Sequence, residues 1–381
     1  MKQKLSLYIT SVALCMLNAI SFSQQTLNKS FVHDGITRTY SIYIPASYQV
    51  SQPVPLVLNL HGRGSTGQQQ ALYTNFSNIA DTANFILVHP DGTTDPLSSQ
   101  TFWNIGLAGT TVDDLGFLAD LVDTLTANYS IIEDRIYSVG MSNGAYMSYV
   151  LACQTNKFRA IASVTGSMTN YMYNNCINGA GIPVIQIHGT EDATVLYNGD
   201  AASKSIEDVV MLWVDKNNCN TPPITTQIPN TNTTDGATAE RFLYSGGTDN
   251  YTVELFKVTG GGHSWPGAIS LPTLGNTCQD FSATKEIWRF FNQYSSNQQV
   301  NVDQLEDLSI EIYPNPSTGI IHIKHKKAID QIKLFDNTGR FLSDVQLSND
   351  QTIDLSTFSS GSYLLELSGN SSTKTIRISL Q

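Results

Sequence analysis

Residues 136–153 run from a short apolar segment through a glycine-flanked turn into a second, longer apolar segment. The turn reads Gly140-Met141-Ser142-Asn143-Gly144. A strand that enters a helix through so sharp a turn brings the two backbones close together, and small residues two positions before and after the serine make this possible. The pattern predicts a strand, a tight turn and a helix, with Ser142 held out at the carboxyl edge of a sheet.

Other short apolar segments alternate with segments of helical spacing along the chain. The expected strands lie within residues 53–64, 85–92, 158–166, 182–189 and 252–260, and the expected helices within 112–129, 206–218 and 283–294. This alternation predicts a mostly parallel sheet with helices on both faces, which is the α/β-hydrolase pattern. An antiparallel hairpin around Asp34-Gly35 should precede it, and the Thr/Asn/Pro-rich stretch 220–238 should form a surface loop.

The two ends of the chain differ from this middle part. Residues 1–23 carry two lysines and then an apolar run, which predicts a secretory signal peptide, followed by a main domain over residues 24–294. Residues 295–307 have the composition of a linker. Residues 308–381 show short alternating strands without helical periodicity, so we expect a small C-terminal all-β sandwich.

Charge and length limit the possible partners. The formal net charge is −11 and no cluster of lysine and arginine precedes the C-terminal part, which argues against nucleic acid or an anionic membrane surface as a partner. No later segment is long and apolar enough for a transmembrane segment. We therefore expect a secreted, extracellular protein, either released or attached to the cell surface, acting on a neutral or weakly charged substrate.

Four cysteines remain after the signal peptide, and an even number in an oxidising compartment suggests two disulfides. Four cysteines allow three pairings. We predict Cys153 with Cys176 and Cys219 with Cys278, because each pair would join neighbouring loops; free buried thiols are the alternative. No C-x-x-C motif or close His/Cys spacing indicates a metal site.

A hydrolase of this pattern places an acid and a histidine after the serine, in that order, at the ends of later strands. His263, in a glycine-rich turn after the last strand, is the predicted base, and Asp192 is the predicted acid. The alternatives are Glu191 and, less favoured, Asp200 for the acid. A further histidine, His188, comes before any plausible acid and is expected to be structural, and His61 and His89 precede Ser142.

An oxyanion hole requires two N–H groups aimed at one point. We expect one from Asn143, the residue after the serine, and one from Arg63 in the loop His61-Gly62-Arg63-Gly64. Trp103 and Trp265 could line a substrate subsite or serve in packing.

Seven blocks of the sequence, in order, resemble the secreted esterases that include polyhydroxybutyrate depolymerases and feruloyl and acetylxylan esterases. The blocks are LNLHGRG, HPDGT, FWN, VDDLGFLADLV, RIYSVGMSNGAYMSYVLAC, IQIHGTED and GGGHSWPG. The resemblance implies a serine carboxylic-ester hydrolase without metal or dissociable cofactor, with Ser142, Asp192 and His263 at the family's triad positions. Ala145-Tyr146 departs from many relatives, which look smaller there, so the shape of the acyl pocket is not implied.

The tail from about residue 308 is similar to the C-terminal sorting domains of type IX secretion, in the blocks IYPNPSTG, KLFDNTGR and SGSYLLEL. This implies that the type IX secretion machinery is a partner. The end, TIRISLQ, has fewer basic residues than usual.

The sequence thus predicts an exported serine esterase acting on an extracellular polymer or its fragments. The substrate is a polyhydroxyalkanoate-type polyester or the feruloyl or acetyl esters of plant polysaccharide. The alternatives are a catalytically silent polymer-binding protein on a hydrolase fold and a serine peptidase of the same fold.

Overall fold

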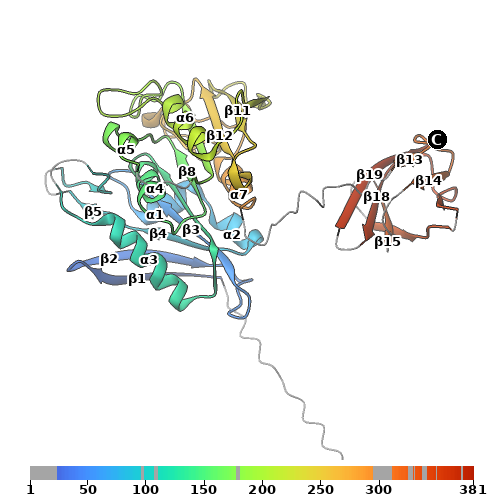
Figure 1. Cartoon of the computed structure of the whole chain (residues 1–381), viewed down its shortest axis with the longest axis horizontal. Coiled ribbons are helices and arrows are strands. Elements are labelled where there is room, and N and C mark those ends of the chain that lie inside the picture. Colours follow the sequence, from blue (N-terminus) through green and yellow to red (C-terminus); the bar gives the residue numbers. More distant parts are fainter. Residues whose placement is uncertain are drawn as a thin grey trace, which may run out of the picture. The chain divides into compact units, whose positions relative to one another are not determined.

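The structure, a computed structural model, describes residues 24–95, 98–106, 110–176, 181–294, 311–324, 329, 331–336, 341–348, 350–369 and 372–381. The chain divides into two compact units, Met1–Ser296 and Asn297–Gln381 (Figure 1). Each unit is described by itself. The predicted signal peptide, 1–23, and linker, 295–307, lie outside the described residues.

The first unit is built on a 10-stranded sheet in the order β1-β2-β4-β3-β7-β8-β9-β12-β11-β10. The strands from β4 to β12 are parallel, and antiparallel strands flank them on both sides. The predicted mostly parallel sheet is confirmed. Its strands are β1 (Gln25–His33), β2 (Ile36–Ile44), β3 (Val54–Leu60), β4 (Ile86–Pro90), β7 (Ile131–Met141), β8 (Ala160–Val164), β9 (Val184–Gly189), β10 (Ile224–Gln227), β11 (Thr238–Tyr244) and β12 (Val253–Thr259).

The central strands are apolar throughout because both faces of the sheet are covered. All residues of β3 are buried. Successive side chains of a strand point to opposite faces, and accordingly Leu56, Leu58 and Leu60 belong to one apolar cluster while Val57 belongs to the other. Two cores, one on each face, therefore hold the sheet in place.

Helices supply the other side of each core. The helices α3, α4 and α6 pack into the cluster of Leu58, and α7 packs into the cluster of Val57. No helix among the described residues is long and apolar enough to cross a membrane. The helices are α1 (Gly67–Thr74), α2 (Ser77–Ala83), α3 (Asp114–Asn128), α4 (Asn143–Gln154), α5 (Asn170–Asn174), α6 (Ile206–Asn217) and α7 (Ala283–Phe291), with short 3-10 turns at Thr248–Asn250 and Pro272–Leu274.

The sequence predicted the hairpin at one edge of the sheet and missed a strand at the other edge. The hairpin at Asp34-Gly35 is confirmed, with both residues at positive φ as a two-residue hairpin turn requires. The stretch 220–238, predicted as a surface loop, contains the edge strand β10, which pairs with β11. All four residues of β10 are exposed, so the strand lacks the alternating apolar pattern that would identify it.

The second unit consists of two antiparallel sheets around one apolar cluster. One sheet has the order β13-β14-β17 and the other β16-β15-β18-β19, which agrees with the predicted small all-β sandwich. The strands are β13 (Glu311–Tyr313), β14 (Ile320–Lys324), β15 (Gln331–Asp336), β16 (Phe341–Val345), β17 (Thr352–Asp354), β18 (Gly361–Gly369) and β19 (Ser372–Leu380).

The cysteines confirm one of the two predicted pairs. Cys153, at the end of α4, forms a disulfide with Cys176, which follows α5. Cys219 and Cys278 are free, so their predicted disulfide is wrong. Cys219 packs against the apolar cluster on one face of the sheet and Cys278 is buried in the cluster on the other face, so the sheet separates the two thiols.

We expect iodoacetamide to label Cys219 and Cys278, and neither Cys153 nor Cys176, when the exported protein is unfolded without a reductant. Replacing both bridged cysteines with alanine should lower the free energy of unfolding by roughly 3 kcal/mol, because a cross-link over this loop restricts the unfolded chain. Peptide mapping and guanidinium denaturation measure the two effects. A disulfide-linked peptide pair containing Cys219 and Cys278 would contradict the structure.

Candidate active site

Ser142 lies between the end of β7 and the start of α4, at the carboxyl edge of the parallel strands. Its backbone has φ 54° and ψ −122°, a strained conformation for a residue with a side chain. A Cβ at Gly140 would overlap the backbone of Gly144, and a Cβ at Gly144 would overlap the backbone of Leu60. The two glycines thus have the steric role that the sequence analysis assigns to them.

His263 and Asp192 come together from the ends of two neighbouring strands. Asp192 follows β9 and His263 follows β12, and Nδ1 of His263 lies 2.8 Å from Oδ2 of Asp192. The other oxygen of Asp192 accepts hydrogen bonds from the backbone N–H groups of Thr194 and Val195, each at 2.8 Å. The carboxylate is therefore fixed at both oxygens, and Nδ1 of His263 donates to it, which leaves Nε2 free to act.

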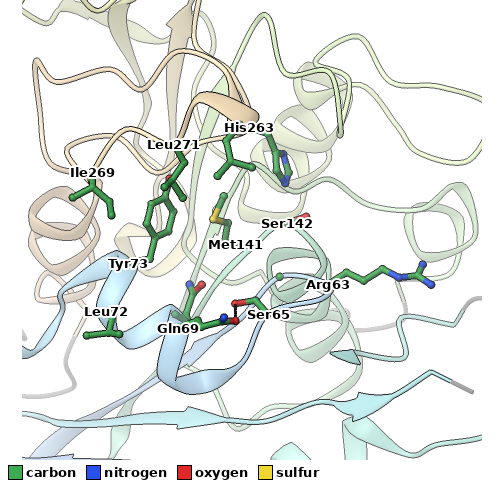
Figure 2. A pocket seen from close by; sticks show the side chains of 13 residues that line it. Arg63, Ser65, Gln69, Leu72, Tyr73, Met141, Ser142, His263, Ile269 and Leu271 are labelled. Carbon is green, nitrogen blue, oxygen red and sulfur yellow. Dashed lines mark hydrogen bonds between the residues drawn. The ribbon is translucent and has the colours of Figure 1, made fainter. Parts of the chain in front are cut away.

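The imidazole of His263 and the hydroxyl of Ser142 line one cavity of about 450 Å³ (Figure 2). The structure thereby brings the predicted serine, acid and histidine to one site. The alternative acids do not reach it: Glu191 is exposed, and Asp200 accepts hydrogen bonds from the backbone of Ala202 and Ser203.

A second imidazole, that of His188, lies on the buried side of Asp192. Its Nε2 is 2.8 Å from the carbonyl oxygen of Val195 and 3.3 Å from Oδ2 of Asp192, and its Nδ1 faces the side-chain amide of Gln186 at 3.0 Å. Burial alone would raise the pKa of Asp192, but the hydrogen bonds and charges of His188 and His263 bring it well below its ordinary value. His188 is fully buried and acts as a fixed partner of the acid.

The two earlier histidines are buried away from the cavity. Nε2 of His61 accepts a hydrogen bond from the N–H of Gly92, so its hydrogen is on Nδ1, which donates to the carbonyl oxygen of Gly62. Burial lowers the pKa of His61, and it lowers the pKa of His89 to about 3. Neither lines the cavity that holds Ser142.

The predicted oxyanion donors flank the serine. Asn143 is the first residue of α4, and the loop that contains Arg63 passes close to Ser142, since a Cβ at Gly62 would lie 3.3 Å from the Cβ of Ser142. The guanidinium of Arg63 points away and pairs with Asp95 at 2.8 Å. The side chain of Arg63 is therefore engaged with Asp95, and the backbone of its loop is the part that lies close to Ser142.

The expectation that Trp103 and Trp265 line a substrate subsite is wrong for this cavity. Trp103 and Trp265 are 0% and 1% exposed, and neither lines the cavity. The indole N–H of Trp103 donates to the carbonyl oxygen of His61 and that of Trp265 donates to the hydroxyl of Thr284. Both tryptophan rings therefore have the packing role that the sequence offered as the alternative.

The cavity has an apolar wall that the sequence analysis did not identify. Leu72 and Ile269 are 78% and 70% exposed, which is unusual for large apolar side chains. Leu72 belongs to a helix whose sequence is mostly polar, and Ile269 follows the GGGHSWPG block, so neither stands out in the pattern. The apolar wall consists of Leu72, Tyr73, Met141, Ile269, Leu271 and Leu274, and the polar wall of Arg63, Ser65, Gln69 and Gln70 (Figure 2).

Among the described residues, Asp235, Cys278 and Asp280 bring three metal-binding atoms within 4.8 Å of one another. Both carboxylates already accept hydrogen bonds from backbone N–H groups. Asp280 accepts hydrogen bonds from the backbone of residues 231 and 232, and Asp235 accepts from the backbone of residues 237 and 279. These carboxylates therefore tie surface loops together.

Two segments of the chain match known families. Residues 38–170 match the family described as esterase PHB depolymerase, and residues 311–381 match the secretion system C-terminal sorting domain. These matches confirm the two resemblances seen in the sequence.

Individual relatives are also esterases. The chain is 25% identical to a bifunctional acetylxylan esterase/xylanase of Neocallimastix patriciarum over 71% of this chain and 35% of that protein. It is 23% identical to feruloyl esterase B of Piromyces equi over 60% of this chain and 42% of that protein. The fold matches an acetyl xylan esterase from Aspergillus awamori with a TM-score of 0.52 and 15% identity, over 70% of this chain and 99% of that one.

We expect Asp192→Asn to reduce the loss of stability on acidification. The pKa of Asp192 is lower in the folded protein than its ordinary value of 3.8, so the ionised carboxylate contributes its full stability above that pH. This contribution is lost progressively as the pH falls from there through the lower pKa of the folded state, and part of it is already lost at pH 3. Melting temperatures at pH 7 and pH 3 measure the effect. Glu133→Gln, at an exposed position, is the control, and its melting temperature should fall between pH 7 and pH 3 as much as that of the wild type. An equal fall in Asp192→Asn and wild type would contradict the stabilising role of the ionised Asp192.

Proposed function

We propose that this carboxylic ester hydrolase, a relative of the polyhydroxybutyrate depolymerases and feruloyl esterases, acts outside the cell on ester bonds of a polymer or its fragments. The substrate is a polyhydroxyalkanoate-type polyester or an ester-substituted plant polysaccharide. One observation carries the proposal: His263, which is hydrogen-bonded to the buried Asp192, lines the same cavity as Ser142 on its strained turn.

The proposed reaction begins with attack of the Ser142 hydroxyl on the ester carbonyl carbon. Nε2 of His263 accepts the hydroxyl proton, and Asp192 stabilises the imidazolium through Nδ1. The C–O bond to the alcohol breaks, the alcohol leaves with the proton from His263, and the acyl group stays on Ser142. Water then attacks the acyl-enzyme with the same proton transfers and releases the carboxylic acid.

The negative charge on the carbonyl oxygen is stabilised in this proposal by the backbone N–H groups of Asn143 and Arg63. Both belong to segments held beside Ser142 by backbone contacts. Fixed donors of this kind need no reorganisation when charge develops, and loss of one typically lowers the rate by about 100- to 1,000-fold.

The apolar wall of the cavity supports a bulky acyl group. A cavity of about 450 Å³ is far larger than an acetyl group and lies in the range of sites for small organic ligands. Leu72, Ile269 and Leu271 can cover an aromatic or branched aliphatic group, whereas an acetyl group would leave them in water. A feruloyl group or a hydroxyalkanoate unit therefore suits this cavity better than an acetyl group.

The two units divide the proposed work. Residues 24–294 carry the ester hydrolysis. Residues 308–381 direct export through the type IX secretion machinery, consistent with the match to a sorting domain over residues 311–381. The mature protein then acts in the extracellular space or at the cell surface.

We expect Ser142→Ala to lower kcat/KM by roughly a thousandfold or more, both for p-nitrophenyl butyrate and for methyl ferulate or hydroxybutyrate oligomers. The purified exported chain is assayed beside Asp192→Asn, which should also be strongly impaired because the asparagine amide favours the wrong tautomer of His263. Ser47→Ala, at an exposed position, should retain wild-type activity, and circular dichroism verifies folding.

Two results would contradict the proposal. A folded wild-type protein that hydrolyses no ester and still binds polymer would identify a catalytically silent binding protein. Peptide hydrolysis that exceeds ester hydrolysis would identify a peptidase.

We expect Leu72→Gln and Ile269→Gln to lower kcat/KM for methyl ferulate or hydroxybutyrate oligomers by about fivefold. Each change removes part of the apolar contact with a bulky acyl group, worth about 1 kcal/mol. For p-nitrophenyl acetate the change should be less than about twofold. Val50→Gln replaces an exposed apolar residue that does not line the cavity and should change neither; equal losses for both kinds of substrate would refute the assignment of the wall.

A further inference from the structure

The short segment of residues 101–103 lies between the two candidate oxyanion donors. It comprises the strand β6 (Thr101–Phe102), which pairs with β5 (Thr93–Thr94), and Trp103. On one side it contacts the turn of Ser142 through a double hydrogen bond. The N–H of Trp103 donates to Oδ1 of Asn143 at 2.6 Å, and Nδ2 of Asn143 donates to the carbonyl oxygen of Trp103 at 3.1 Å. The side-chain amide of Asn143 thus fixes the first residue of α4 to this segment.

On its other side the same segment contacts the loop 61–65. The indole N–H of Trp103 donates to the carbonyl oxygen of His61 at 2.9 Å, and the N–H of Gly64 donates to the carbonyl oxygen of Thr101 at 2.8 Å. The hydroxyl of Thr101 donates to the carbonyl oxygen of Ser65. The loop is therefore held at both ends, on either side of Arg63, whose N–H is the second candidate donor.

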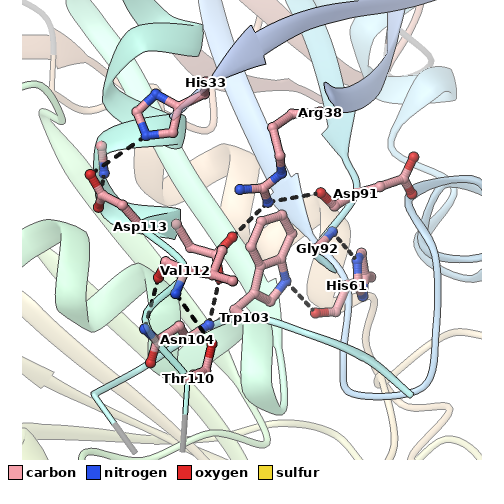
Figure 3. A network of polar contacts seen from close by, with 12 residues as sticks. His33, Arg38, His61, Asp91, Gly92, Trp103, Asn104, Thr110, Val112 and Asp113 are labelled. Carbon is pink, nitrogen blue, oxygen red and sulfur yellow. Dashed lines mark hydrogen bonds and ion pairs between the residues drawn. The ribbon is translucent and has the colours of Figure 1, made fainter. Parts of the chain in front are cut away.

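A buried ion pair anchors the segment to the body of the fold (Figure 3). The N–H of Asn104 donates to Asp114 at 2.7 Å, and the other oxygen of Asp114 accepts from Arg38 at 2.6 Å. Arg38 and Asp114 are 2% and 1% exposed, and Arg38 also donates to the carbonyl oxygen of Asp91 at 3.2 Å. The segment is accordingly attached to β2, on which Arg38 lies, and to the start of α3.

We propose that residues 101–103 form a bracket that sets the spacing of the two oxyanion donors, with Thr101, Trp103 and the Asn143 side chain as positioning residues. The proposal rests on the proposed function, in which the N–H groups of Asn143 and Arg63 stabilise the oxyanion. The two donors come from separate backbone segments, one after β3 and one after β7. The bracket joins both directly through side-chain hydrogen bonds.

The bracket should affect the transition state and leave substrate binding unchanged. A carbonyl oxygen moves and gains charge as the tetrahedral intermediate forms, so donors displaced by about 1 Å lose most of their effect on the rate. Apart from Met141 on β7, the apolar wall that holds the acyl group belongs to α1 and to residues 269–274, and none of the hydrogen bonds of the bracket described above goes to these residues. Kinetic constants for the reaction and for ground-state binding therefore separate a positioning role from a general loss of structure.

The test compares Asn143→Ala, Thr101→Val and Trp103→Phe in the full exported chain. Asn143→Ala keeps the backbone N–H and removes both bonds to Trp103. Thr101→Val keeps the shape of the side chain and removes only its bond to Ser65, so it remains informative if Trp103→Phe folds poorly. Trp213→Phe is the matched control, because Trp213 is fully buried and its indole N–H has no hydrogen-bond partner in the described structure.

For Asn143→Ala and Trp103→Phe we expect kcat for p-nitrophenyl butyrate to fall by about 10- to 100-fold with KM within about twofold. The inhibition constant of phenylboronic acid, which forms a tetrahedral adduct with a serine, should rise by a similar factor. Thr101→Val should show a smaller change, of about threefold to tenfold, in the same direction. Trp213→Phe should leave kcat and the inhibition constant unchanged.

Wild-type kcat and boronate inhibition in Asn143→Ala and Thr101→Val would overturn the bracket. Equal increases in KM and in the inhibition constant of a carboxylate product would also overturn it, because they would show a loss of ground-state binding. Failure of the proposed function is recognised separately: a fluorophosphonate would then not label Ser142 in the wild-type protein, whatever the variants do.

Discussion

Three backbone segments meet at Ser142, and their close contact is the constraint on which the first unit depends. The end of β7, the start of α4 and the end of β3 approach so closely that a single Cβ at Gly140 or Gly144 would overlap a neighbouring backbone. The turn between β7 and α4 must therefore be strained, as the positive φ of Ser142 shows. Such strain persists only where the surroundings over-determine the conformation. Here β7, which packs into both cores, and α4, which packs into one of them, supply that constraint, and the serine is held out at the sheet edge as a result.

The electrostatics of the site depend on one buried carboxylate with two different imidazole partners. Oδ2 of Asp192 faces His263 on the cavity side and His188 on the core side. The amide of Gln186 donates to Nδ1 of His188 and its oxygen accepts from Tyr149, so the hydrogen of His188 is on Nε2 and points toward Val195 and Asp192. The hydrogen bonds that link Tyr149, Gln186 and His188 thus keep the Nε2–H of His188 directed at Asp192, whatever position the side chain of His263 takes. His263, at the cavity, is then the imidazole whose Nε2 is available for proton transfer.

The features that the sequence predicted well are those set by local chemistry. The apolar strands, the glycines around Ser142 and the strand-end positions of Asp192 and His263 follow from patterns within a few residues, and the structure brings these three side chains to one site. The features it missed depend on tertiary contacts. Both tryptophans are enclosed by segments distant in sequence, the sheet separates Cys219 from Cys278, and β10 is an exposed edge strand recognisable only by its pairing with β11. A pattern within a few residues does not show which distant segments of the chain will come into contact.

The parts of the site that would perform the reaction and the parts that would select the substrate belong to different elements. Ser142, Asp192 and His263 follow β7, β9 and β12, strands of the central parallel sheet that pack on both cores. Except for Met141 of β7, the apolar wall comes from α1 and from residues 269–274. There Leu72 and Ile269 have few neighbours to constrain them, as their exposure shows. Substitutions in this wall would change the shape of the cavity at little cost in stability, whereas changes at the strand ends would disturb the sheet. In the function proposed above, this division would let the fold keep one ester chemistry while changes in the wall alter which acyl group is accepted.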